Sequence, residues 1–167
     1  MKIKYISILL LLLFSLSGCN DNDDVVAIFT GKTWKLNVIY HLGKTDISYW
    51  KNDEAAYNES IKKLKEGGFF VKFDGSQADN VVTGTFTGQG YDSSFSGNWS
   101  CNAASKQITI TSFEAKGTEK DVFAKAFVNA MQNVISYRKG SDFNNLYLDF
   151  KEGVETKYMS FTVLREE

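Results

Sequence analysis

Apolar and polar residues alternate along most of the chain, and this alternation is typical of strands with one buried face. Between residues 31 and 40, Trp34, Leu36, Val38 and Tyr40 share one parity. The same alternation recurs in six further short segments, which are residues 69–75, 80–90, 93–102, 106–113, 145–150 and 157–164. We therefore predict about seven short strands. The short links between them favour antiparallel neighbours.

Two segments change to helical spacing. In residues 52–68, Tyr57, Ile61 and Leu64 fall on one helical face, with Asn52 or Asp53 as the cap and Gly67-Gly68 as the end. Residues 118–137 predict a longer helix, for which Thr118 and Asp121 form a capping box. Its apolar stripe is predicted to pack in the core and consists of Phe123, Phe127, Ala130, Met131 and Val134.

These elements predict the fold class. The chain is expected to be mainly β with α (α+β), a curved antiparallel β-sheet or barrel of about seven strands with one long helix and one shorter helix. Strands with a single apolar face must cover it, either by closing into a barrel or by packing on helices.

The N-terminus has the features of an export signal. Lys2 and Lys4 precede an almost wholly apolar run over residues 6–16, which is too short for a membrane span and suits a signal-peptide core. Residues 16–19, Leu-Ser-Gly-Cys, resemble the bacterial lipobox, which implies cleavage before Cys19 and lipidation of that residue. We expect a lipoprotein signal peptide at 1–18, a lipidated cysteine and acidic tether at 19–29, and a barrel domain at 30–167.

The composition and the predicted cellular location restrict the kinds of partner that the protein can bind. The polar, acidic run over residues 20–24 resembles the surface-export signals of Bacteroides-type lipoproteins. We expect an outer-membrane lipoprotein of the cell envelope, held by the lipid at Cys19. The acidic run is compatible with export to the cell surface and, alternatively, with a periplasmic domain whose tether the acids only keep solvated. The net charge of −1 and the lack of a basic stripe argue against nucleic acid. With Cys19 lipidated, a single further cysteine remains, which excludes a disulfide framework.

The order of motifs resembles the META (HslJ-like) domain over about residues 30–165. The resemblance rests on the Gly-x-x-Trp-x-Leu opening at Gly31, on residues 95–99 (FSGNW), on the ITIT segment, on the long helix and on the closing LYLDF and MSFTVL segments. It implies a barrel-like fold and no firm activity. A Gly-Cys-Asn stretch of that family is replaced by residues 91–94 (YDSS), so its roles are not transferred. The Trp34 opening also resembles that of lipocalins, whose barrels hold small apolar ligands.

No catalytic constellation is visible, so we expect no enzyme, no metal site and no cofactor. His41 is the single histidine and is interpreted as an ordinary strand-end residue, and Cys101 as a buried thiol beside Trp99. Aromatic residues are the candidates for ligand binding, namely Trp34, Tyr40, Tyr49, Trp50, Tyr91 and Trp99.

Two functional hypotheses remain open. The first is a non-enzymatic binding or accessory domain whose partner is an envelope protein or a glycan. The alternative is a lipocalin-like carrier of a small apolar ligand. A hydrolytic enzyme has little support.

Overall fold

The computed structural model describes residues 24–164, so the predicted signal peptide and Cys19 lie outside the described residues. The helices are α2 (Val25–Phe29), the 3-10 helix η2 (Ser48–Trp50), α3 (Glu54–Glu66) and α4 (Val122–Gln132). The strands are β1 (Thr33–His41), β2 (Lys44–Thr45), β3 (Phe70–Ala78), β4 (Val81–Gln89), β5 (Ser93–Asn102), β6 (Gln107–Gly117), β7 (Val134–Lys139), β8 (Asn145–Glu152) and β9 (Glu155–Val163).

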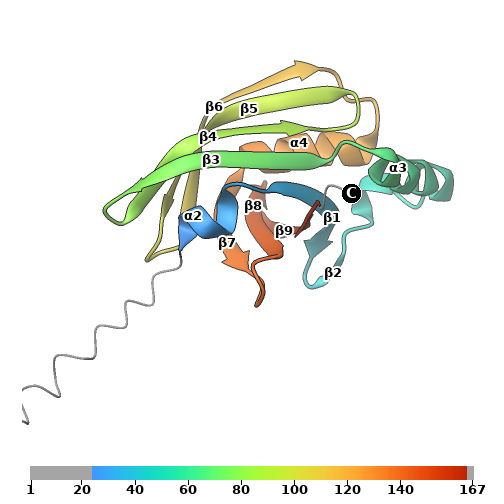
Figure 1. The fold of residues 1–167 in the computed structure, drawn as a ribbon. Helices are drawn as coiled ribbons and strands as arrows, with labels where there is room; N and C mark the ends of the chain where they lie inside the picture. The colour runs from blue at the N-terminus through green and yellow to red at the C-terminus, as the bar shows by residue number, and fades with distance from the viewer. Residues whose placement is uncertain (1–23, 165–167) are drawn as a thin grey trace, which may run out of the picture.

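The strands form a closed antiparallel barrel (Figure 1). Their order in the sheet is β2-β1-β3-β4-β5-β6-β7-β8-β9, and β1 also pairs with β9, with Leu36 opposite Phe161 and Tyr40 opposite Tyr158. Eight strands close the barrel and β2 adds a short extra strand beside β1. The predicted class, mainly β with one long and one shorter helix, is confirmed.

The alternation predicted for β3 to β6 is confirmed by the burial of their side chains. Along β5, Phe95, Trp99 and Cys101 point inward and are buried, whereas Ser94 and Asn98 are exposed. Strand β3 extends to Ala78, beyond the predicted segment 69–75, and pairs with β4 up to a tight turn at Asp79. The β3–β4 hairpin is therefore longer than predicted.

The helix predicted over residues 118–137 is shorter in the structure, where it spans Val122–Gln132 as α4. Asp121 alone caps α4, because its side chain accepts hydrogen bonds from the backbone N–H groups of Phe123 and Ala124. The helix ends at Gln132, and residues 134–139 form strand β7. β6 and β7 share a single register pair, Gln107 with Ser136, and α4 lies between the β3–β6 layer and β8 (Figure 1). The inner face of α4 thus fills the barrel where the two strands diverge.

Aromatic side chains fill the barrel interior. Phe29 packs against Trp99, Tyr137 and Phe73, with ring centroids 4.9, 5.2 and 5.0 Å apart. A second group surrounds Phe127 of α4, whose ring meets Phe69, Phe95 and Phe161 at 5.5–6.2 Å. The predicted stripe of α4 is buried, as expected.

The expected tether is corrected at its C-terminal part. Residues Val25–Phe29 form helix α2, and the side chains of Val25, Ile28 and Phe29 are buried in the core. Asp24 caps this helix by accepting a hydrogen bond from the backbone N–H of Ala27. The folded domain therefore includes residues 24–29, because three apolar residues of the predicted tether complete the barrel core.

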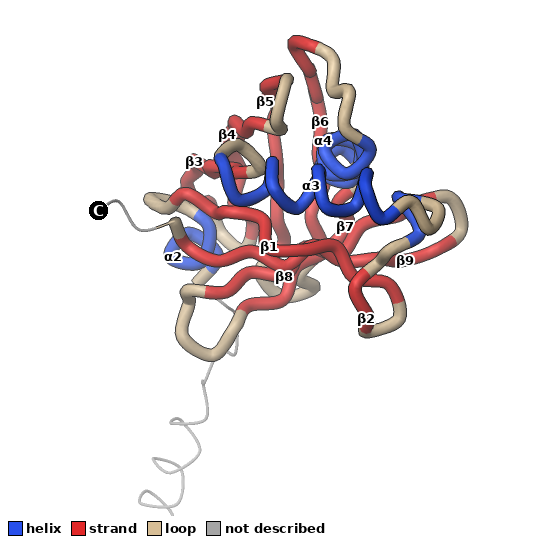
Figure 2. The backbone as a smooth tube through the Cα atoms, turned by 90° about the vertical axis from the view of Figure 1, so that its right-hand side faces the viewer, coloured by secondary structure: helices blue, strands red, loops and turns tan. Residues whose placement is uncertain are grey.

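Helix α3 crosses one end of the barrel (Figure 2). Asp53 caps its N-terminus and Gly67 follows its last residue, as the sequence predicts. Among residues 24–164, no helix combines the length and apolar character required to span a membrane.

Candidate functional site

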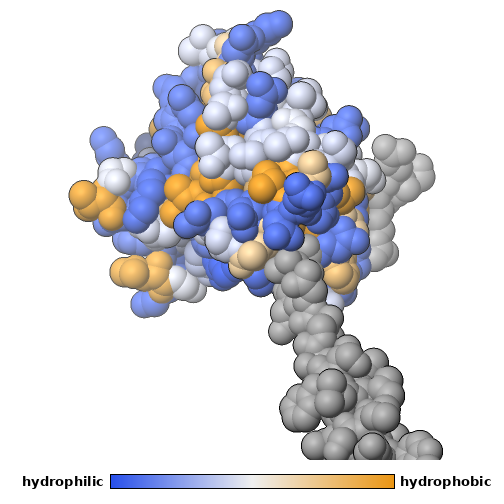
Figure 3. Space-filling model, turned by 90° about the vertical axis from the view of Figure 1, so that its left-hand side faces the viewer, coloured by the Kyte–Doolittle hydropathy of each residue, from blue (hydrophilic) through white to orange (hydrophobic). Residues whose placement is uncertain are grey.

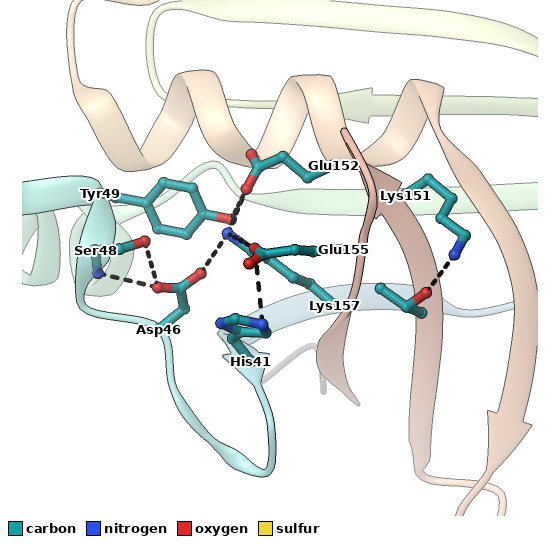
Figure 4. Close-up of polar contacts among 9 residues, drawn as sticks. His41, Asp46, Ser48, Tyr49, Lys151, Glu152, Glu155 and Lys157 are labelled. Atoms are coloured by element: carbon teal, nitrogen blue, oxygen red, sulfur yellow. Dashed lines mark hydrogen bonds and ion pairs between the residues drawn. The ribbon is translucent and has the colours of Figure 1, made fainter.

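One end of the barrel carries a buried cluster of charged side chains (Figure 4). Lys157 of β9 lies with its ammonium 2.7 Å from the carboxylate of Asp46, and both side chains are about 5% exposed or less. The ammonium also donates to Glu152 at the end of β8 and lies 3.9 Å from Glu155. The cluster joins the segment after β2 to the β8–β9 hairpin, which is distant in sequence.

Hydrogen bonds and aromatic contacts complete this cluster. Asp46 accepts bonds from the backbone N–H and the hydroxyl of Ser48, at 3.0 and 2.6 Å. The Tyr49 ring lies 4.8 Å from the Lys157 ammonium, and its hydroxyl donates to Glu152 at 3.5 Å. A buried lysine that is surrounded in this way remains charged, because carboxylates and an aromatic face replace its water shell.

The pKa directions agree with this geometry. Burial alone would raise the pKa of Asp46, but the Lys157 ammonium and the two Ser48 bonds outweigh burial and hold it below its ordinary value. Burial alone would lower the pKa of Lys157, but its bonds to Asp46 and Glu152 outweigh burial and raise it. Burial, followed by the charge of Glu152, raises the pKa of Tyr49. The lowered pKa of Asp46 and the raised pKa of Lys157 therefore keep this pair ionised at neutral pH.

Three aliphatic side chains project into solvent around the cluster. Leu42 in the β1–β2 turn is 86% exposed, Val154 in the β8–β9 turn is 96% exposed, and Ile47 beside Asp46 is 61% exposed. His41 and Glu155, which flank the two turns, lie 3.7 Å apart, so the turns are neighbours. We call Leu42, Ile47 and Val154 the apolar tips. Leu42 has a positive φ of 49°, which is unusual for a residue of this type.

A notch of about 320 Å³ opens beside Ile47, and its wall also includes Trp50, Asn52, Asp53, Glu54 and Tyr57. The Trp50 indole is held in place, since it donates to the Ser60 hydroxyl at 2.8 Å. That hydroxyl in turn donates to Asp121, the cap of α4, at 2.7 Å. The Trp50 ring packs on Tyr57 and Phe123, with centroids 4.9 and 5.2 Å apart. The notch therefore has a rigid aromatic floor.

The six aromatic residues predicted from the sequence do not form one cluster. Trp34 and Trp99 are buried in the core, and their indole N–H groups donate to the backbone oxygens of Phe29 and Asp74. Only Tyr49 and Trp50 come together, at the charged end of the barrel. A ligand on the outer surface has access to Tyr40, Tyr49 and Tyr91 more readily than to Trp34 or Trp99.

Tyr40 belongs to a stack on the outer wall of the barrel. Its ring packs against Tyr158 at 4.8 Å with an interplanar angle of 19°. The guanidinium of Arg138 lies 4.6 Å from the Tyr158 ring and pairs with Asp149 at 2.7 Å. The Tyr158 ring is therefore contacted by both the Tyr40 ring and the Arg138 guanidinium.

Tyr91 lies in the β4–β5 turn, far along the chain from the tips. The carboxylate of Glu119 organises this turn by accepting bonds from the backbone N–H groups of Tyr91, Asp92 and Ser93, at 2.9–3.0 Å. It also accepts a bond from the Ser93 hydroxyl at 2.6 Å. The turn overlaps residues 91–94, where the sequence lacks the Gly-Cys-Asn stretch of the META pattern. In this protein the Glu119 carboxylate satisfies the backbone N–H groups of the turn.

The remaining surface is mixed in character. Figure 3 shows apolar side chains as small separate patches among polar ones on one face of the molecule. A broad groove of about 680 Å³ is lined largely by polar residues of β3, β4 and the β1 entrance, including Lys32, Lys72 and Thr85. His41 ends β1, and Cys101 is buried within the core.

Sequence reasoning did not find Asp46, Glu152 or Lys157. A signal for Lys157 was present, since it shares the inward parity of Met159 and Phe161 in β9, and a lysine at such a position needs buried partners. Its partners Asp46 and Glu152 have no comparable signal.

A family model described as "Domain of unknown function (DUF4847)" matches residues 20–163. The protein therefore belongs to this family, whose function is unknown. The comparison with curated proteins finds no match.

Proposed function

We propose that the protein is a non-enzymatic binding domain that a lipid at Cys19 holds on the cell envelope, with its docking surface at the charged end of the barrel. The anchor is supported by the lipobox-like residues 16–19 and the apolar run before them. The partner is a protein, because the docking surface combines apolar tips with aromatic side chains.

The apolar tips are the observation that carries the binding function. Leu42 and Val154 are almost fully exposed at the ends of two neighbouring turns, where polar residues would serve the fold equally well. The buried cluster of Lys157 and Asp46 fixes the segment that carries Ile47, so the three tips keep a defined spacing. A preorganised apolar surface loses little entropy when a partner binds.

The path of β1 through the domain supports binding of the apolar tips to a protein partner rather than to the membrane that holds the lipid anchor. β1 leads from α2 to the tips, and its nine residues span about 27 Å. Helix α2 lies near the start of β1, whereas β2, which follows the turn that carries Leu42, lies toward the other end of β1 (Figure 1). A tether of five residues from Cys19 to Asp24 reaches at most about 18 Å. We infer that the tips face away from the bilayer.

The carrier alternative has support from the barrel itself, because small-ligand carriers use closed barrels. The interior, however, is filled by aromatic rings such as Phe29, Trp99 and Phe127, all at most 2% exposed. An apolar ligand would have to displace these rings. We therefore favour recognition on the outside of the barrel and propose that the META resemblance reflects a shared fold rather than a shared ligand.

Fractionation of cells tests the anchor. Cys19→Ala is expected to move the protein from the membrane fraction to the soluble fraction, whereas Cys101→Ser serves as a matched cysteine control and leaves it in the membrane fraction. The mass of the N-terminal fragment should show acyl chains on Cys19. A Cys19→Ala protein that stays in the membrane fraction would overturn the anchor.

Native mass spectrometry of the domain from its own envelope separates the two modes of binding. A bare polypeptide mass supports recognition on the outer surface. A stable extra mass that is released on denaturation supports the carrier and contradicts our proposal.

A further inference from the structure

We propose that the notch beside Ile47 binds an arginine side chain of the protein partner. This inference rests on the proposed docking function and adds the chemistry of one contact. The wall of the notch combines an aliphatic side, an aromatic floor and two carboxylates. These three kinds of group suit an arginine side chain, which carries a guanidinium on a long apolar stem.

The apolar part of the notch suits the stem of arginine. Ile47 is 61% exposed and forms one side, while Trp50 and Tyr57 form the floor with their rings at right angles (82°). The Trp50 ring cannot swing out to fill the space itself, because its N–H is bonded to Ser60 and one face packs on Phe123. The space is therefore a fixed feature of the surface.

The rim of the notch suits the charged head. Asp53 uses one carboxylate oxygen, Oδ1, to cap α3 by accepting from the Ala56 N–H at 3.0 Å, and this cap also offsets the positive end of the helix. Glu54 follows it at the start of the helix. The cationic neighbour Lys51 is exposed and does not line the notch, so the lining keeps two negative charges. A planar guanidinium can meet carboxylates and an aromatic face at once.

The test uses small probes on the intact domain. N-acetyl-arginine amide is titrated into the ¹⁵N-labelled protein, and N-acetyl-citrulline amide serves as a neutral probe of almost the same shape. We expect saturable shifts of the Trp50 indole N–H and the backbone amides of residues 47–57 at millimolar concentration. The arginine probe should bind about fivefold more tightly than the citrulline probe, as one cation–π and rim-charge contribution implies.

A pair of variants on one helix separates charge from structure. Glu54→Gln is expected to reduce the preference for the arginine probe to about twofold or less. Glu59→Gln makes the same change five residues later in α3, outside the notch, and should leave the preference unchanged. Spectra that are otherwise superimposable show that both variants fold.

Equal binding of both probes, shifts scattered over the surface, or an unchanged preference in Glu54→Gln would overturn the arginine site. These results would leave the anchor at Cys19 and docking through Leu42 and Val154 intact, since none of these residues lines the notch. Conversely, if the experiments on membrane attachment or on docking through the tips fail, the probe titration still decides whether the notch binds arginine.

Discussion

Replacing Lys157 by methionine tests the buried cluster most severely. Methionine keeps much of the side-chain length and removes the ammonium, so Asp46 is left as a carboxylate with a 4% exposed side chain and no cation. Breaking a buried ion pair in this way costs about 3–5 kcal/mol. Glu152 contributes little to that loss, because its side chain is 42% exposed and water can replace the ammonium. We expect the free energy of unfolding in urea to fall by about 3 kcal/mol at pH 7.

Two further variants show whether the loss comes from the uncompensated carboxylate. In the double variant Lys157→Met/Asp46→Asn, the asparagine oxygen still accepts from Ser48 while the buried charge is gone, so we expect recovery of about 2 kcal/mol. Lys151→Met in the same hairpin removes an exposed lysine that donates to Thr156, and should change stability by about 0.5 kcal/mol or less. A loss of less than about 1 kcal/mol for Lys157→Met, or no recovery in the double variant, would refute the reasoning.

The pH dependence of the unfolding free energy provides an independent test of the Lys157–Asp46 pair. The folded-state pKa of Asp46 is lowered, so its contribution to stability is complete above its unfolded value near pH 4 and is lost as the pH falls through the lowered pKa. Without the ammonium, the pKa of Asp46 rises relative to wild type. The difference in unfolding free energy between wild type and Lys157→Met should therefore shrink as the pH falls from 7 to 4. A gap that widens over this range would contradict the assignment.

Three further variants test the fold that holds the site, each by urea unfolding followed through tryptophan fluorescence. Glu119→Gln should cost about 2–3 kcal/mol, because an amide cannot accept from all three N–H groups of the turn, whereas exposed Glu114→Gln should be neutral. Gly84→Ala should cost about 2 kcal/mol or more, since its Cβ would lie 1.9 Å from the Asp74 carbonyl oxygen, and Thr85→Ala beside it is the control. Phe127→Ala should cost about 3–5 kcal/mol, whereas Val154→Ala, at 96% exposed, should change stability little. Equal effects within any of these pairs would contradict the packing described above.

The strands that the sequence predicts well are those with strict alternation, such as β5, where Phe95, Trp99 and Cys101 share the inner face. The sequence misassigns β7 because Val134 follows Met131 at helical spacing and so extends the apolar stripe of α4. The β-branched pair Val134-Ile135 after Asn133, the C-cap residue, is the local signal for the change. Helix α2 escapes prediction because five residues are too few for a periodic pattern.

The candidate site was accessible to sequence reasoning only in part. Tyr49 and Trp50 were identified as aromatic candidates, and they do lie at the charged end. Their partners Asp46, Glu152 and Lys157 are brought together by closure of β1 on β9, which joins the two ends of the domain. No local spacing encodes such a contact. The exposure of Leu42 and Val154 likewise depends on where two turns lie relative to each other.

Photo-crosslinking in intact cells tests the central claim most directly. A benzoylphenylalanine at Val154 is compared with one at Thr109, an exposed residue on the outer wall of β6. The proposed docking surface predicts a discrete protein adduct from position 154 and none from position 109. It also predicts that the adduct weakens when Leu42 and Ile47 are replaced by serine. No adduct from position 154, or equal adducts from both positions, would contradict docking through the apolar tips.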